Sequence, residues 1–148
     1  MIQAKRYHDI SCGHRVVGHE GKCKNLHGHN YRITFTVEGA LDSVGRVLDF
    51  GVIKTKLCDW LEREWDHRTL LWWKDPFVSP SYQDRRNVPI CLDELDPTIV
   101  IVPFNPTAEN IAKYLVEVVG PCELIGTGAK LVACEVEETR KCSAIYEI

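Results

Sequence analysis

The apolar positions near the N-terminus follow the period of a β-strand. Every second residue of the run 30–37 is apolar, namely Tyr31, Ile33, Phe35 and Val37. A period of two is typical of a strand with one buried face. An earlier strand is expected at roughly Gln3 to His14, and the two strands would form an antiparallel hairpin that ends near Gly39.

Two later stretches carry apolar residues at helical spacing. The first begins at Asp49 and should end near Trp65 to His67. Its apolar residues are Phe50, Ile53, Leu57, Trp60 and Leu61. The second begins at Asn105-Pro106-Thr107, which supplies capping side chains and a proline for the first turn. Its apolar residues are Ala108, Ile111, Ala112, Leu115 and Val119. Gly120-Pro121 is expected to stop this helix.

Three further β-type runs complete the pattern. A short one lies at Thr98–Val102, and the last two strands are expected at about Lys130 to Thr139 and about Ser143 to Ile148. The order ββααββ predicts a single α+β domain over residues 1–148, with a four-stranded antiparallel sheet and two helices on one face. The other sheet face and both edges would stay uncovered, which favours a homo-oligomer.

Composition narrows the classes of function. With 148 residues, of which 45% are hydrophobic, the chain is long enough for one domain with a sizeable core. Its formal net charge of −3 provides no general attraction to nucleic acid or anionic membrane. No apolar stretch approaches membrane-spanning length, and the first residues lack the apolar region of a signal peptide. A cytoplasmic protein is therefore expected.

Three histidines form a candidate metal site. Counting back along the second strand places His29 and His27 on its apolar face, with Gly28 between them. The hairpin would bring His14 level with both. Three neutral imidazoles can hold zinc with one position left for water or substrate, which is a catalytic arrangement. Two alternatives stay open: Cys23 closes the site as a fourth, inert ligand, or the histidines are only polar residues at a strand entry.

The cysteines do not form a framework. Their number is seven, with no Cys-x-x-Cys pair, which fits neither a set of disulfides nor a four-cysteine zinc site. Cys12 and Cys134 fall on apolar strand faces and Cys58 lies in a predicted helix, so all three are expected in the core. Cys23 differs because it lies in a polar loop, where Lys22 and Lys24 would favour its reactive thiolate form.

Two carboxylates are candidates for ligand binding. Glu138 continues the strand face of Val132, Cys134 and Val136, so it would lie at the mouth of a buried face. Its two oxygens match the paired N–H groups of a guanine-like or pterin ring, although an ordinary charge at a strand end is equally consistent. Glu109 lies in the first turn of the second helix, where the helix dipole favours a carboxylate whatever the function.

Asp66-His67 ends the first predicted helix. A histidine at this position can simply be a cation at a helix C-terminus. With the aspartate on one ring nitrogen, it can also serve as a proton-transfer pair, because the carboxylate fixes the tautomer and supports acid–base chemistry at the other nitrogen.

Several motifs together resemble those of the 6-pyruvoyltetrahydropterin synthase family. They are Ile10-Ser11-Cys12-Gly13-His14, Cys23-x-x-x-His27-Gly28-His29-Asn30-Tyr31, Asp49-Phe50, Asp66-His67, Pro106-Thr107-Ala108-Glu109-Asn110 and Glu138-Thr139. The spacing between Cys23 and His27 is similar to that of the bacterial 6-carboxytetrahydropterin synthases of 7-deazaguanine and queuosine biosynthesis. Three positions, Ile10, Trp65 and Leu71, depart from the residues common in the family, and none of them is a reacting group.

The resemblance implies a tunnelling fold that assembles into trimers and hexamers (dimers of trimers), with active sites at subunit interfaces. It implies that zinc binds His14, His27 and His29. It also implies Cys23 as the general base, Asp66 with His67 as a second proton relay, and Glu138 and Glu109 as pterin anchors with Thr107 nearby.

The implied reaction is zinc-dependent conversion of 7,8-dihydroneopterin triphosphate to 6-carboxy-5,6,7,8-tetrahydropterin, with release of acetaldehyde and triphosphate. Two alternatives remain, a 6-pyruvoyltetrahydropterin synthase that stops after triphosphate elimination, and a zinc-binding module without catalysis. Charge and loop position alone make Lys22, Lys24, Arg85 and Arg86 candidates for binding the triphosphate.

Overall fold

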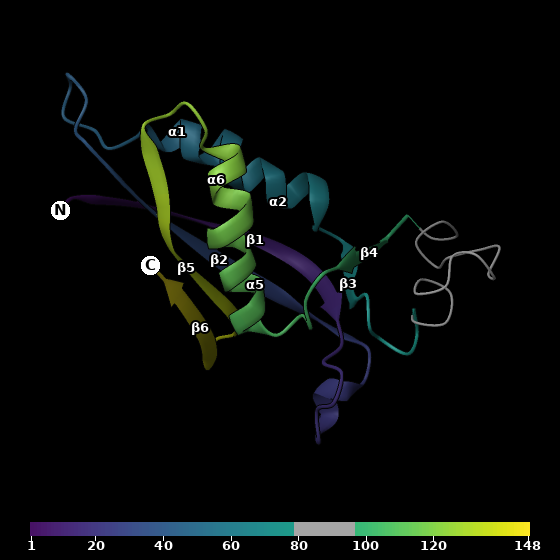
Figure 1. Ribbon diagram of the computed structural model, residues 1–148. Coiled ribbons are helices and arrows are strands. Elements are labelled where there is room, and N and C mark those ends of the chain that lie inside the picture. Colours follow the sequence, from purple (N-terminus) through teal and green to yellow (C-terminus); the bar gives the residue numbers. More distant parts are fainter. Residues whose placement is uncertain (79–96) are drawn as a thin grey trace.

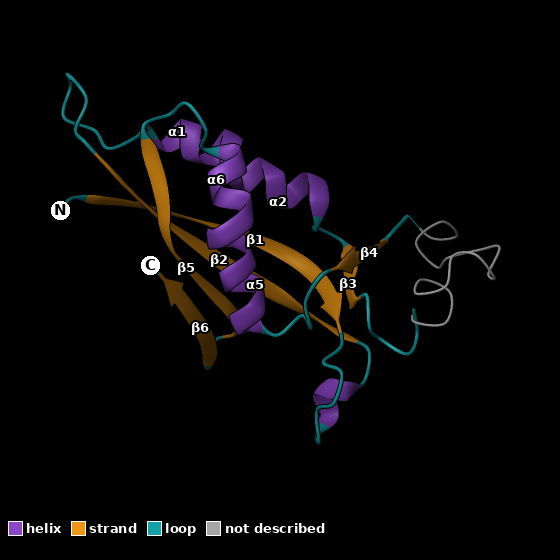
Figure 2. Ribbon diagram, in the orientation of Figure 1, coloured by secondary structure: helices purple, strands orange, loops and turns teal. Residues whose placement is uncertain are grey.

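The computed structural model describes residues 1–78 and 97–148, and its centre is a six-stranded sheet with the order β4-β3-β1-β2-β5-β6. The helices lie across one face of this sheet (Figure 1). The strands are β1 Gln3–His14, β2 His27–Gly39, β3 Arg68–Trp72, β4 Ile99–Val102, β5 Ala129–Thr139 and β6 Cys142–Glu147. Helices and strands are therefore segregated into two layers, which confirms the predicted α+β class (Figure 2).

The predicted hairpin is confirmed. β1 and β2 pair antiparallel, with His14 opposite His27 and Cys12 opposite His29. β2 continues to Gly39, and β5 and β6 extend the sheet beyond it, again antiparallel. The pairing of the hairpin brings the three histidines to the same end of the sheet.

The prediction of a four-stranded antiparallel sheet is wrong by two strands. β3 pairs parallel with the end of β1, and β4 pairs parallel with β3. Leu70 and Leu71 are adjacent in β3 and both are buried. A strand covered on both faces has no alternation of apolar and polar residues, so the period of two does not reveal it. The run predicted at Thr98–Val102 is β4.

The first helix is continuous from α1, Phe50–Ile53, through a π-helical turn, Lys54–Cys58, to α2, Asp59–Glu64. Asp49 caps it as predicted, because its carboxylate accepts a hydrogen bond from the Gly51 N–H at 2.7 Å. Its end at Glu64 leaves 65–67 as the turn into β3.

The second helix does not stop at Gly120-Pro121. It runs from α5, Ala108–Tyr114, through the π-helical turn Leu115–Val119, into α6, Gly120–Glu123. Pro121 lies just after the π-helical turn, so the continuous helix accommodates it near its C-terminal end. Gly120 serves packing, since a Cβ there would lie 2.7 Å from the Leu131 Cβ. The glycine therefore allows close contact between the helix and the sheet.

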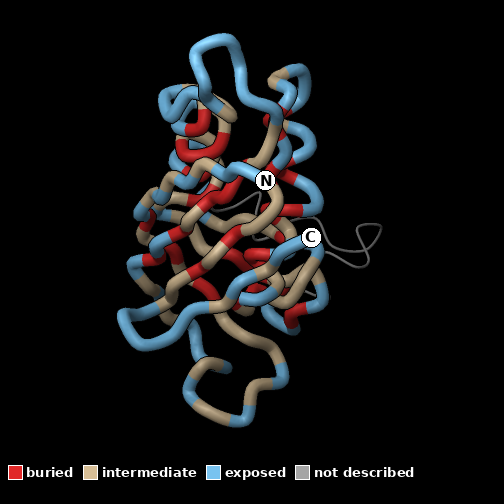
Figure 3. Tube along the Cα trace, turned by 90° about the vertical axis from the view of Figure 1, so that its left-hand side faces the viewer, coloured by how far each residue is buried: buried red, intermediate tan, exposed pale blue. Residues whose placement is uncertain are grey.

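One core fills the space between the helices and the sheet. Its buried residues come from alternate positions of the strands and from the inward faces of both helices, while the loop 40–46 is exposed (Figure 3). In β5, Cys134 and Val136 are buried as predicted, but Val132 is not. The pairing of β5 with β2 shifts at this point, and Leu131 takes the buried place. A bulge of one residue explains the change of face.

The sheet face opposite the helices is uncovered. A shallow hollow there is lined by residues of β1, β2, β5 and β6, including Lys5, Glu135 and Ile145. Among the helices in residues 1–78 and 97–148, none has the length and apolar character needed to cross a membrane.

Candidate active site

Three histidines from the β1–β2 hairpin converge at one point. His14 ends β1, whereas His27 and His29 begin β2. One ring nitrogen of each lies within 4.8 Å of those of the other two. The three imidazoles are contributed by paired strands, which fixes their relative positions. Within the described residues, this is the group of ligand atoms that could hold a metal ion.

The tautomers of two histidines suit a metal ion. His14 Nδ1 donates to the Pro106 carbonyl oxygen at 2.6 Å, and His27 Nδ1 donates to the Asn25 carbonyl oxygen at 2.7 Å. In the neutral rings both Nε2 atoms then carry lone pairs. These Nε2 atoms lie 3.1 Å apart. Two facing lone pairs repel unless a cation lies between them, and carbonyl partners of this kind commonly orient metal-binding histidines.

His29, the third histidine, is also in a state that suits a metal ion. His29 Nε2 is buried and has no hydrogen-bond partner. Burial lowers the pKa of His14 to about 4 and also lowers the pKa of His29. Both rings are consequently neutral near pH 7, which is the form that binds metal. The donor set of three imidazole nitrogens fits a zinc-type ion.

Glu138 lies beside the three histidines of the candidate metal site. Its carboxylate oxygens are 3.8 Å from His14 Nε2 and 3.9 Å from His29 Nε2. The same side chain lines a cavity of about 290 Å³ that also includes Thr107 and Glu109. The predicted carboxylates are therefore brought together next to the candidate metal site.

Cys23 lines this same cavity, which we call the cysteine cavity. It lies in a short 3-10 helix, Lys22–Lys24, within the loop between β1 and β2. It is not in the group of mutually close ligand atoms formed by the histidines. This placement favours a role for Cys23 other than closing the metal site.

Three consecutive residues connect the parts of the site. Asn105 binds the backbone of Val17 twice, with Oδ1 accepting from its N–H and Nδ2 donating to its carbonyl oxygen, each at 2.9 Å. Pro106 accepts the hydrogen bond from His14, and Thr107 caps α5 by accepting from the Asn110 N–H. The segment 105–107 thus joins the loop, a metal-binding histidine and the helix that carries Glu109.

Asp66 and His67 form a hydrogen-bonded pair. His67 Nδ1 donates to Asp66 Oδ2 at 2.7 Å, and the Ser11 N–H donates to Asp66 Oδ1 at 2.9 Å. Partial burial disfavours the charged carboxylate, but these hydrogen bonds outweigh it and lower the pKa of Asp66. The pair therefore consists of a carboxylate and an imidazole whose Nε2 is free to exchange a proton.

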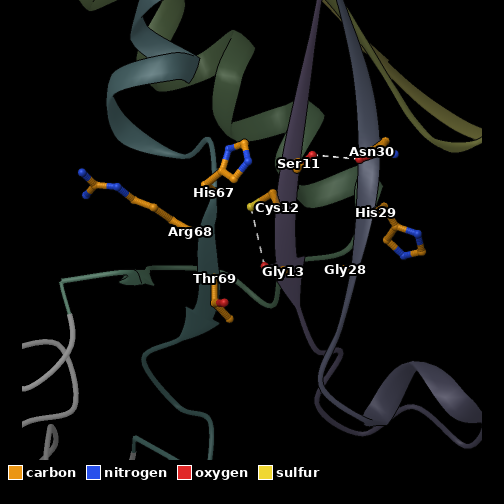
Figure 4. Close-up of a pocket in the computed structure, with 9 residues that line it drawn as sticks. All are labelled: Ser11, Cys12, Gly13, Gly28, His29, Asn30, His67, Arg68 and Thr69. Carbon is orange, nitrogen blue, oxygen red and sulfur yellow. Dashed lines mark hydrogen bonds between the residues drawn. The ribbon is translucent and has the colours of Figure 1, made fainter.

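The Asp66–His67 pair adjoins a different cavity. His67 lines a space of about 380 Å³ together with Cys12, His29 and Thr69. His67 projects from the turn before β3 and His29 from β2, with β1 running between them (Figure 4). This second space shares no lining residue with the cysteine cavity. Within the described part of one chain, Cys23 and His67 thus belong to separate cavities.

The other predicted residues are placed as follows. Cys12, Cys58 and Cys134 are buried as expected, and burial raises the pKa of Cys12 to about 12, so it is an unreactive thiol. Lys22 and Lys24 are exposed in the loop and do not line the cysteine cavity. Arg85, Arg86 and Cys91 lie outside the described residues.

Two residues next to the cysteine cavity are not singled out by the sequence pattern. His19 lines the cavity, and Asn105 was expected only as a cap of the second helix. The setting of His19 between Gly18 and Gly21, just before Cys23, was an available signal of a tight turn beside the cysteine. The contact of Asn105 with Val17 joins residues 88 positions apart, so no local pattern indicates it.

Comparison with known proteins agrees with this arrangement. The family model described as 6-pyruvoyl tetrahydropterin synthase matches residues 3–148. A 6-carboxy-5,6,7,8-tetrahydropterin synthase of Rickettsia typhi is 32% identical over 143 residues, which cover 96% of this chain and 97% of the relative.

Solved structures share the fold. An uncharacterized protein of Wolinella succinogenes aligns with a TM-score of 0.81 at 25% identity, covering 99% of this chain and 97% of that one. The 6-pyruvoyl tetrahydropterin synthase of Caenorhabditis elegans aligns with a TM-score of 0.64 at 23% identity, covering 99% and 95%. The fold is thus the tunnelling fold expected from the motifs. With a family model that spans nearly all of its length, the chain belongs to the 6-pyruvoyl tetrahydropterin synthase family.

Proposed function

We propose that the protein converts 7,8-dihydroneopterin triphosphate to 6-carboxy-5,6,7,8-tetrahydropterin, releasing acetaldehyde and triphosphate, as a cytoplasmic lyase of 7-deazaguanine and queuosine biosynthesis. The observation that carries the proposal is the lining of one cavity by Cys23, Glu109 and Glu138, next to three histidines prepared for a metal. The relative from Rickettsia typhi, named for this product, supports the choice within the family.

The two glutamates suit recognition of the pterin ring. A pterin presents adjacent N–H groups that a carboxylate can accept as a pair, and such charge-assisted bonds are stronger than neutral ones. Glu138 and Glu109 line the cavity from β5 and α5, two elements whose contact with each other is fixed by the core. Thr107, whose oxygen accepts from the Asn110 N–H, retains a hydroxyl proton to donate.

The metal site fits zinc held by His14, His27 and His29. Zinc, when bound, supplies Lewis-acid polarisation of the side-chain oxygens of the substrate. Such polarisation would acidify the neighbouring C–H, and Cys23 as thiolate would be the base that removes this proton. Asp66 holds His67 with its proton on Nδ1, so His67 Nε2 exchanges protons with the substrate as the triphosphate departs.

The proposed chemistry needs both cavities, so we assign the Asp66–His67 pair of each site to a second copy of the chain. Two sheet edges are available for such assembly. Among the described residues, β6 pairs with β5 alone, and β1 pairs with β3 over Cys12–His14, while the backbone of Ser11 bonds to Asp66 and His67. This leaves Gln3–Ile10 without a neighbouring strand along one side. Open edges of this length favour strand pairing between copies. A homo-oligomer, proposed as a hexamer built from two trimers, would place the sites at subunit interfaces.

The deciding experiment is product analysis by mass spectrometry after the zinc-loaded protein meets 7,8-dihydroneopterin triphosphate. We expect 6-carboxy-5,6,7,8-tetrahydropterin with acetaldehyde, and a loss of at least about 10²-fold in rate for Cys23→Ala, because the base is removed. Cys122→Ala is the matched control, since Cys122 is exposed on α6 and lines neither cavity.

The alternative products separate the remaining activities. A 6-pyruvoyl product without acetaldehyde would assign the chain to the other branch of the family. Absence of turnover with any pterin triphosphate, or full activity of the Cys23→Ala variant, would contradict the proposed mechanism.

A further inference from the structure

His19 is held in the loop of Cys23 by a turn of defined geometry. Gly18 has a φ of +83°, a left-handed conformation that glycine adopts without strain. The His19 N–H then donates to the Val16 carbonyl oxygen at 3.3 Å, and the Val16 N–H donates to the Cys23 carbonyl oxygen at 2.8 Å. The turn therefore closes on itself and brings His19 and Cys23 to the same cavity.

The imidazole of His19 is oriented by one of its own neighbours. The Gly21 N–H donates to His19 Nδ1 at 2.8 Å. In the neutral ring the proton must then lie on Nε2, which is a hydrogen-bond donor. A Cβ at position 21 would lie 3.1 Å from His19 Cε1, so glycine at this position gives the ring its space. Nδ1 is therefore occupied by a hydrogen bond within the loop, and Nε2–H is the donor that His19 can offer to a ligand in the cavity that it lines.

The cavity combines acceptors with a small number of donors. Glu109 and Glu138 accept hydrogen bonds only, whereas a ligand that gives its N–H groups to them presents acceptor atoms elsewhere on its ring. Buried acceptors left without a donor reduce affinity. On the basis of the proposed function, we propose that His19 Nε2–H donates a hydrogen bond to an acceptor atom of the pterin ring bound in this cavity.

Two substitutions of His19 separate the two ring nitrogens. His19→Asn keeps an acceptor near the position of Nδ1, so the hydrogen bond with Gly21 is retained while the distal donor is lost. His19→Gln keeps a donor near the position of Nε2 and loses the acceptor toward Gly21. A ligand-binding role predicts that the asparagine variant binds weakly and the glutamine variant binds well. If His19 only stabilises the loop through Gly21, the asparagine variant should bind well and the glutamine variant weakly.

The test is isothermal titration of the zinc-loaded full chain with 7,8-dihydroneopterin, which carries the ring without phosphate. We expect His19→Asn to raise Kd about 5-fold, the usual effect of one lost hydrogen bond. His19→Gln should stay within about 2-fold of the wild type. The rate of Cys23 alkylation by iodoacetamide, followed by peptide mass spectrometry, should be the same for His19→Asn and wild type, because the loop is intact.

Three results would overturn the inference. These are wild-type affinity of His19→Asn, equal weakening by both substitutions, and altered alkylation of Cys23 in His19→Asn. Glu138→Gln distinguishes failure of the inference about His19 from failure of the proposed function. If that variant binds weakly while His19→Asn binds normally, only the inference about His19 fails. If the wild type does not bind the pterin, the proposed function fails and the role of His19 fails with it.

Discussion

His67 has a backbone conformation that few histidines adopt. Its φ is +57°, in the left-handed region that is uncommon outside glycine and asparagine. The residue follows the end of α2, a position where helices often end in this conformation. Its N–H donates to the Ser11 carbonyl oxygen at 2.7 Å, and its side chain is 80% exposed. Strain of this kind persists where neighbouring contacts enforce it, and here it presents an imidazole to an open cavity.

Asp66→Asn is expected to keep the fold and impair the reaction. The amide oxygen can still accept from the Ser11 N–H, so the free energy of unfolding should change by about 1 kcal/mol or less. The amide NH₂ facing His67 would reverse the tautomer, leaving Nδ1 as an acceptor and a proton on Nε2. The turnover rate should fall by about 10²–10⁴-fold, measured under saturating substrate.

The stability of the protein at acid pH gives a second measure of the same pair. The pKa of Asp66 is lowered, so its contribution to stability is present above the unfolded pKa and is lost as the pH falls through the lower folded value.

The control for the turnover rate of Asp66→Asn is Asp42→Asn, which alters an aspartate paired with Arg46 on the surface and should keep the wild-type rate. A wild-type rate in Asp66→Asn would remove the pair from the mechanism.

At the scale of elements, the segment 105–107 shows where sequence-based prediction succeeds and where it stops. A helix start was predicted there and is confirmed, because capping side chains act locally, but Pro106 precedes the cap and does not lie in the first turn as predicted. The cap itself is Thr107, and Asn105 instead binds a loop far away in the sequence. The same limit applies to β3, whose parallel partners are distant and whose buried leucines do not alternate. Periodicity predicts elements, and only the fold shows which distant elements meet.

Asn105→Ala is expected to loosen the loop that carries Cys23. It removes both hydrogen bonds to Val17, and the free energy of unfolding should fall by about 1–3 kcal/mol because two part-buried backbone groups lose their partners. Alkylation of Cys23 should become several-fold faster, because the loop opens more often when these hydrogen bonds are absent. Peptide mass spectrometry after timed exposure to iodoacetamide provides the rate.

The matched control is Asn25→Ala, in the same loop but with an exposed residue. It should alkylate at the wild-type rate. If Asn105→Ala alkylates no faster than Asn25→Ala, the segment 105–107 does not restrain the cysteine.

At the scale of the whole molecule, the sheet is covered on one face only. The opposite face carries a hollow lined by charged and apolar residues, and Ile145 is 63% exposed there, on the outermost strand. The uncovered face was predicted from the order of strands and helices alone. The short parallel strands β3 and β4 were not, and they cover only the end of β1 near the histidines. The long antiparallel edges are therefore left free for association.

Ile145→Lys is expected to weaken self-association. A charge on an edge strand opposes pairing with another chain, so sedimentation velocity should show smaller species for this variant than for the wild type. The control is Ile125→Lys, because Ile125 is 80% exposed in the turn after α6 and lies outside β1 and β6. Its sedimentation should match that of the wild type. Unchanged sedimentation of Ile145→Lys would contradict assembly through β6.

The hydrogen bond between His14 and Pro106 has a thermodynamic consequence. Asn105 holds the loop of Cys23, Pro106 orients His14, and Thr107 begins the helix that carries Glu109. If zinc binds His14 and a pterin binds the cysteine cavity, as proposed, then ordering of this segment by one ligand favours binding of the other. Linkage is reciprocal, so the factor by which zinc strengthens pterin binding must equal the factor by which the pterin strengthens zinc binding.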